Sequence, residues 1–124
     1  MNKNTLPRNK SLKSTKLIDT LFEKGKTIIV YPLRLVYIYT DEIVEQDFQV
    51  SFTVSKKKFK NAVDRNYIKR LMRESFRKQQ HQIKPKNIAM MWIFMDKNKP
   101  DYEAIHKSVE KIIEKLNKKN NGTT

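Results

Sequence analysis

Basic residues recur at helical spacing between residues 65 and 77, and their chemistry is that of phosphate binding. With an advance of about 100° per residue, the polar positions of this segment fall within an arc of roughly 140°. They are Arg65, Asn66, Lys69, Arg70, Arg73 and Arg77. The opposite arc carries Tyr67, Ile68, Leu71, Met72, Ser75 and Phe76, which predicts that this side packs on a core. Guanidinium groups bind phosphate through paired hydrogen bonds and ammonium groups act as point charges, so the pattern indicates a polyanionic partner.

Two other interpretations of this basic helix are weaker. A solvated helix surface usually balances its cations with acids one turn away, but only Asp64 and Glu74 oppose them here, and Asp64 stands at the helix start. A basic amphipathic helix can also lie on an anionic membrane. The mixed aromatic and aliphatic side opposite the cations favours a core helix instead. We therefore expect a nucleic-acid partner and no membrane.

The composition sets the frame for this prediction. The chain has 124 residues and a net charge of +14, which suits one domain that binds an acidic partner. Acids gather instead at residues 41–47, so the two signs are segregated. Without cysteine the chain forms neither disulfides nor thiolate metal sites, and with no signal-peptide-like or membrane-spanning apolar run we expect a cytoplasmic protein.

Hydrophobic periodicity predicts one α+β domain over residues 12–116, between a flexible basic arm at 1–11 and a flexible tail at 117–124. The expected order is α-β-β-β-α-β-α, in a small two-layer sandwich. The expected segments are a helix ending at Gly25, strands at 27–30, 33–39 and 48–55, a helix at 62–80, a strand at 88–95 and a helix from Pro100 to Leu116. We expect the strands at 33–39 and 48–55 to pair as a hairpin, and the strand at 88–95 to be central because it is apolar on both faces.

Residues that could perform catalysis are scarce. His81 and His106 have no acid or cysteine at ligand spacing, and Gly25 and Gly122 are the only glycines, so there is no glycine-rich phosphate loop. We expect neither catalytic residues nor a protein metal site.

The apolar residues of the first helix have two possible roles. Ile18 and Phe22 lie one helical turn apart and either belong to the core, which the sequence alone favours, or form a platform for unstacked bases. Tyr37, Tyr39 and Trp92 are expected in the core.

The segment Asn61-Ala62-Val63-x-Arg65-Asn66-x-x-Lys69-Arg70-x-x-Arg73-Glu74, directly after Val54-Ser55-Lys56-Lys57, resembles the signature of the bacterial ribonuclease P protein subunit. The resemblance extends over about residues 8–116. It implies a four-stranded sheet with three helices and a left-handed β-α-β crossover, although such crossovers are right-handed in about 98% of cases. It also implies an accessory subunit of an endoribonuclease whose catalytic RNA and Mg²⁺ ions perform the hydrolysis.

The resemblance further implies two sets of contact residues. Contacts to the catalytic RNA subunit would come from Lys56, Lys57, Lys58, Lys60, Asn61, Arg65, Asn66, Lys69, Arg70 and Arg73. Contacts to the single-stranded 5′ leader of precursor tRNA would come from Ile18, Phe22, Arg34, Val36 and Thr53.

Two other functions remain to be separated from this one. A ribosomal-type structural RNA-binding protein would share the charge and the fold but would have no substrate cleft. A helix-turn-helix DNA binder would need two adjacent helices, whereas strands are expected between residues 28 and 55, so we expect no DNA partner.

Overall fold

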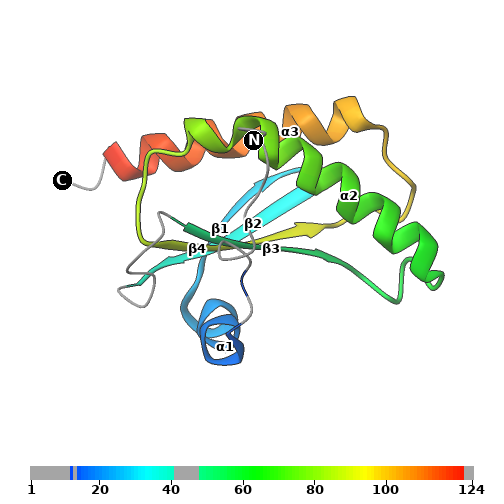
Figure 1. Cartoon of the computed structure of the whole chain (residues 1–124), viewed down its shortest axis with the longest axis horizontal. Helices are drawn as coiled ribbons and strands as arrows, with labels where there is room; N and C mark the ends of the chain where they lie inside the picture. Colours follow the sequence, from blue (N-terminus) through cyan, green and yellow to red (C-terminus); the bar gives the residue numbers. More distant parts are fainter. Residues whose placement is uncertain (1–11, 13, 41–47, 122–124) are drawn as a thin grey trace, which may run out of the picture.

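The computed structural model describes Leu12, residues 14–40 and residues 48–121, and the predicted order of helices and strands is confirmed (Figure 1). The elements are α1 (Thr15–Lys24), β1 (Lys26–Val30), β2 (Leu33–Tyr39), β3 (Phe48–Val54), α2 (Ala62–Gln79), a 3₁₀ turn (Gln80–Gln82), β4 (Ile88–Phe94) and α3 (Tyr102–Asn121). Helix α3 continues past the expected boundary at Leu116 into the segment that we predicted as a flexible tail. The predicted arm at 1–11 lies outside the described residues.

The four strands form one mixed sheet in the order β1-β2-β4-β3. Strand β2 pairs antiparallel with both β1 and β4, whereas β3 pairs parallel with β4. The predicted hairpin between β2 and β3 is therefore wrong. The reason lies in β4, which is buried along nearly its whole length and takes the place between β2 and β3, as its apolar pattern predicted. Strand β3 alternates buried with half-buried residues and lies at the edge.

Helices α2 and α3 cover one face of the sheet and α1 covers the other (Figure 1). The larger core lies beneath α2 and α3, where Phe76 makes edge contacts with Phe52 and Trp92 at centroid separations of 5.8 Å. This side matches the predicted α+β sandwich, and α1 adds a second helical cover. The hand of the β3–α2–β4 crossover stays a prediction.

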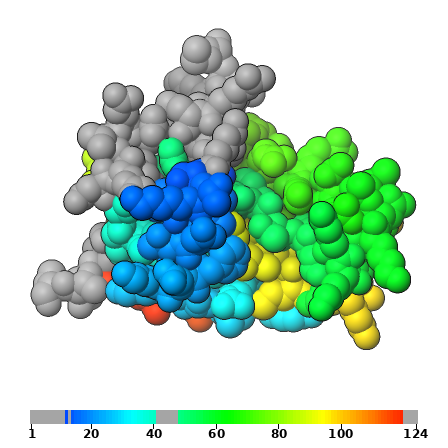
Figure 2. Space-filling model, turned by 90° about the horizontal axis from the view of Figure 1, so that it is seen from below, coloured from blue at the N-terminus to red at the C-terminus, as the bar shows by residue number. Residues whose placement is uncertain are grey.

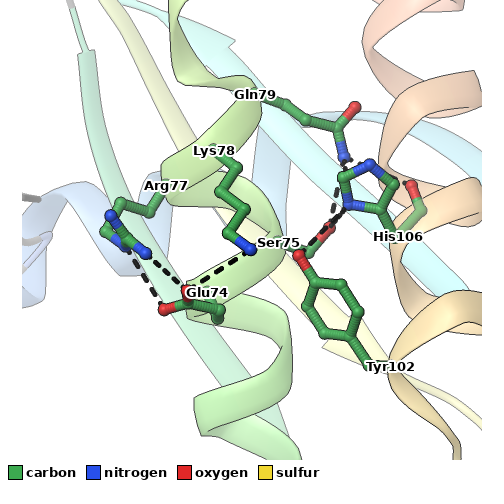
Figure 3. A network of polar contacts seen from close by, with 7 residues as sticks. All are labelled: Glu74, Ser75, Arg77, Lys78, Gln79, Tyr102 and His106. Atoms are coloured by element: carbon green, nitrogen blue, oxygen red, sulfur yellow. Dashed lines mark hydrogen bonds and ion pairs between the residues drawn. The ribbon is translucent and has the colours of Figure 1, made fainter. Parts of the chain in front are cut away.

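A polar network joins α2 to α3 (Figure 3). The Nδ1 atom of His106 lies within hydrogen-bond distance of Ser75 Oγ and Gln79 Nε2, both at 3.2 Å, and of Tyr102 Oη at 3.3 Å. Gln79 Nε2 also donates to the His106 carbonyl oxygen at 3.2 Å. His106 is thus a boundary residue that fixes the packing of the two helices.

Helix α1 crosses the opposite face of the sheet from β3 towards β2. The backbone N–H of Leu12, just before the helix, donates to the Val50 carbonyl oxygen of β3 at 2.8 Å. Ser14 Oγ caps the helix by accepting from the Leu17 N–H at 3.2 Å. At the other end Gly25 lies directly on Val36 of β2, where a Cβ atom would be only 2.6 Å from Val36 Cγ1. The buried residues of α1, Leu17 and Leu21, form a second, smaller core.

Candidate nucleic-acid interface

The start of α2 is fixed by side chains that surround its first turn. Asn61 Oδ1 accepts from the Val63 N–H at 2.9 Å and caps the helix, so Asn61 has a structural role besides its expected RNA contact. Asp64 accepts from Lys99 Nζ at 2.8 Å. That hydrogen bond, together with the charge of Asp64, holds the pKa of Lys99 above its usual value. Lys99 thereby brings a further cation, which the sequence analysis did not identify, to the beginning of α2.

Nearly all of the side chains expected to contact the RNA subunit lie at the surface. They are the N-cap residue Asn61, the lysines of the basic loop, which we define as residues 56–60, and the polar face of α2, which we define as Arg65, Asn66, Lys69, Arg70 and Arg73. The exposed members are Lys56, Lys57, Lys58, Lys60, Asn61, Asn66, Arg70 and Arg73. Lys69 and Arg65 are half-buried. The structure therefore brings loop and helix cations together at one end of α2.

Arg65 organises the basic loop. Its Nη1 atom donates to the carbonyl oxygens of Phe59 at 2.7 Å and Lys60 at 2.9 Å. Phe59 itself is buried and packs on Phe94 with ring centroids 5.9 Å apart. The sequence analysis did not single out Phe59, although a lone aromatic residue within a run of lysines is the signal that could have revealed this anchor. Arg65 and Phe59 together hold the backbone that carries the loop lysines.

One acid, Glu74, pairs with the two cations that follow the polar face along α2 (Figure 3). Arg77 Nε donates to Glu74 Oε2 at 3.3 Å, and Lys78 Nζ lies 3.8 Å from Glu74 Oε1. The hydrogen bond from Arg77 is the main cause of a lowered Glu74 pKa, so this carboxylate stays ionised and offsets the two cations. Arg73 instead lies over the Phe52 ring at 5.4 Å and forms no ion pair within the described part of the chain.

On the α1 side of the sheet, one cross-strand row remains outside the main cover of α1. The pairing register aligns Ile29, Arg34, Ile93 and Thr53 across β1, β2, β4 and β3. Ile29 and Arg34 are exposed, and Ile93 and Thr53 are half-buried. We call these four residues the open strip. Strands lie about 4.8 Å apart, so Arg34 and Thr53, two strands apart, are separated by roughly 10 Å.

Val36 does not belong to this accessible surface. It lies in the next row, beneath α1, and is only 4% exposed. The prediction that Val36 contacts a leader is therefore wrong, because alternation along β2 identifies the face but not the helix that covers it. Figure 2 shows α1, in blue, across the middle of this face, with β3 and α2, in green, to one side.

The two apolar residues of α1 differ in accessibility. Ile18 is half-buried against the smaller core, whereas Phe22 is 63% exposed. The sequence-based preference for a core position is thus wrong for Phe22, which is available to a partner. Tyr39 was also expected in the core and is exposed at the end of β2, whereas Tyr37 and Trp92 are buried as predicted.

The described residues contain no group of three or more His, Cys, Asp or Glu side chains arranged to hold a metal ion. None of the described helices combines the length and the apolarity needed to cross a membrane.

These features define a small, strongly basic α+β protein with a cationic helix on one face of its sheet and a short helix on the other. The family model described as Ribonuclease P matches residues 6–117. The chain is 31% identical over 102 residues to the ribonuclease P protein component of Porphyromonas gingivalis, covering 77% of this chain and 74% of the relative. It is also 31% identical over 129 residues to that of Chlorobium phaeobacteroides, covering 91% and 88%. The chain belongs to the ribonuclease P protein family.

Solved structures show the same fold. The RNase P protein of Staphylococcus aureus superposes with a TM-score of 0.71 at 24% identity, covering 85% of this chain and 93% of that one. The RNase P protein of Thermotoga maritima gives a TM-score of 0.71 at 19% identity, covering 85% and 96%.

Proposed function

We propose that this protein is the accessory subunit of a ribonuclease P ribonucleoprotein that removes the 5′ leader from precursor tRNA. The basic loop and the polar face of α2 bind the catalytic RNA subunit. Phe22, the open strip and the flank of α1 at Ile18 bind the single-stranded leader. Family membership supports the subunit role, and the geometry below supports the division into two contact surfaces.

One observation carries this proposal: the two surfaces meet at the end of β3. Thr53 of the open strip is followed after Val54 by Ser55 and the basic loop, so an RNA chain crossing the strip arrives directly at the loop lysines. Ser55 Oγ accepts from the Lys57 N–H at 3.1 Å and turns the chain at this junction. A leader on the strip and a catalytic RNA on α2 would therefore be held side by side.

The chemistry available to the described side chains is binding rather than proton transfer. Cations neutralise phosphates and release condensed counterions, while Phe22 and Ile29 offer apolar surface to unpaired bases. Mg²⁺ would act through the RNA subunit, as the resemblance to the ribonuclease P protein family implies. The protein would lower the Mg²⁺ requirement by reducing phosphate repulsion between the catalytic RNA and its substrate.

A reconstituted cleavage assay tests the proposal. The protein should stimulate cleavage of precursor tRNA by a bacterial ribonuclease P RNA at low Mg²⁺, whereas a ribosomal-type RNA-binding protein should not. The assay should be run with the full chain and repeated with the variants described next.

The substitution Phe22→Ala tests the leader surface independently of the surface for the catalytic RNA. We expect it to weaken precursor tRNA binding by about 1–3 kcal/mol if a base stacks on the ring, and to leave mature tRNA binding unchanged because mature tRNA has no leader. Tyr39→Ala, which removes an exposed aromatic side chain from the opposite face of the sheet, is the matched control. Equal losses with both tRNAs, or a urea midpoint lowered as by Leu21→Ala, would remove Phe22 from the leader surface.

A further inference from the structure

Two exposed apolar side chains interrupt the cationic surface of α2. Val63 is 71% exposed and Tyr67 is 41% exposed, although helical periodicity predicted that Tyr67 would face the core. Among the described residues, Val63, Asn66, Tyr67 and Arg70 line a shallow pocket of about 370 Å³. Their spacing of i, i+3, i+4 and i+7 places them in one stripe along the helix.

This stripe is unusual for a surface that must stay solvated. Val63 and Tyr67 lie together on a helix whose other exposed residues are mostly charged, and such local departures from patterning are expected at functional positions. Cations lie close by: Arg70 is in the pocket wall, and Lys99 is held at 2.8 Å by Asp64, which precedes Tyr67 by three residues on the helix. An apolar protein segment would gain nothing from these cations. A nucleotide would use the apolar stripe for its base and the cations for its phosphate.

The four lining side chains match the parts of one nucleotide. A tyrosine ring offers a flat face on which any base can stack. The amide of Asn66 can donate and accept hydrogen bonds at a base edge, and the guanidinium of Arg70 can bind the adjoining phosphate through paired hydrogen bonds. Val63 extends the apolar floor by one helical turn.

Resting on the function proposed above, we propose that this pocket receives one unpaired nucleobase of the RNA subunit, stacked on Tyr67. A base within a duplex is already stacked on both faces, so only a bulged, looped or terminal base can enter. Besides binding phosphates, α2 would then discriminate between RNAs, because it favours RNA that presents an unpaired base beside its backbone.

Two model RNAs test this inference with the full-length protein. Both are hairpins with the same stem, closed by a non-nucleotide linker so that the loop offers no unpaired base, and one carries a single bulged adenosine. Wild-type protein should prefer the bulged hairpin. Tyr67→Leu should weaken binding of the bulged hairpin by roughly 5- to 150-fold, the equivalent of one lost base stack, and should leave the fully paired hairpin unchanged.

Tyr67→Phe is the matched control, because it keeps the ring and removes only the hydroxyl group. It should bind both hairpins like the wild type, and replacing the bulged adenosine by an abasic site should abolish the wild-type preference. If Tyr67→Phe loses as much affinity as Tyr67→Leu, the hydroxyl group and not the ring makes the contact, and the inference is overturned. Equal losses of Tyr67→Leu on both hairpins overturn it as well.

Arg70→Ala distinguishes a failure of the pocket from a failure of the proposed function. If Arg70→Ala weakens binding of both hairpins while Tyr67→Leu changes nothing, the base pocket is refuted and phosphate binding by α2 stands. If neither variant alters affinity and binding is insensitive to salt, the RNA-binding role of α2 is refuted together with the pocket.

Discussion

Replacing Arg65 by alanine should reduce both stability and RNA affinity, unlike the replacement of its neighbour Arg70 on the same polar face. Arg65 donates to the carbonyl oxygens of Phe59 and Lys60 at 2.7 and 2.9 Å, and these two bonds hold the basic loop against the start of α2. Arg70 is exposed and lines the pocket described above. The two arginines therefore differ in structural role while sharing charge and helix face.

The size of the stability loss follows from these two bonds. A hydrogen bond from a charged donor contributes about 1.5–3 kcal/mol when well buried, and Arg65 is only half-buried, so solvent replaces part of that contribution. We expect Arg65→Ala to lower the free energy of unfolding by about 1–3 kcal/mol. For a domain of this size that corresponds to roughly 3–5 °C in melting temperature per kcal/mol. Arg70→Ala should change the stability by less than about 0.5 kcal/mol, as is usual at the surface.

RNA binding gives an independent measure of whether Arg65→Ala releases the basic loop. Each lost phosphate contact reduces the slope of log affinity against log salt by about 0.7–0.9. Arg70→Ala should remove one contact, whereas Arg65→Ala releases the loop that carries Lys56, Lys57 and Lys60 and should remove two or more. Urea melts and salt titrations of both variants, with Arg65→Lys as a charge-preserving control, measure these quantities. Identical melts and identical slopes for the two alanine variants would refute a structural role for Arg65.

Two further predictions concern charge and packing. Glu74→Gln should raise RNA affinity by up to roughly fivefold at low salt, because Arg77 and Lys78 lose their acid partner, and binding titrations at two salt concentrations measure the gain. The Glu74 pKa is lowered in the folded state, so any stability that Glu74 contributes is present above its unfolded pKa of about 4.3. That stability disappears as the pH falls through the lower folded pKa. At still lower pH, wild type and Glu74→Gln should melt at the same temperature. Gly25→Ala should destabilise the protein by about 1–3 kcal/mol in urea melts, because the new Cβ atom would lie 2.6 Å from Val36 Cγ1 and closer still to the Leu21 carbonyl oxygen. An unchanged urea midpoint would refute this close packing at the end of α1.

Most element boundaries followed from local patterns, but the end of α3 and the strand pairing did not. Helix and strand periodicity, the Asn61 cap and the two-sided burial of β4 are local properties of the sequence. The expected hairpin of β2 with β3 came from their proximity in the chain, whereas the observed order depends on burying both faces of β4 between them. The apolar pattern of β4 indicated a central strand, but which two strands flank it depends on the whole sheet and has no local signal.

The errors among candidate site residues have a common cause. Alternation and helical periodicity assign a residue to a face, but not to the element that covers that face. Val36 and Phe22 were both placed on the α1 side of the molecule, and only the path of α1 buries the first and exposes the second. Arg65 likewise belongs to the polar arc, but the helical pattern does not show that it hydrogen-bonds the loop backbone. That contact depends on the turn that packs Phe59 on Phe94.

The position of β4 also explains how one small sheet could serve the two proposed RNA partners. Because β4 is central, the crossover from β3 must return over one face, and this places α2 with its cations there, while α1 occupies the other face. Strand β3 is left at the edge, with Thr53 on the α1 side and Phe52 beneath Arg73 on the α2 side. Adjacent residues of a strand point to opposite faces, so β3 contributes one residue to the proposed leader surface and the next to the surface of α2. The proposed leader and catalytic RNA contacts thus depend on the apolar sequence of β4, a strand that lies almost entirely within the core.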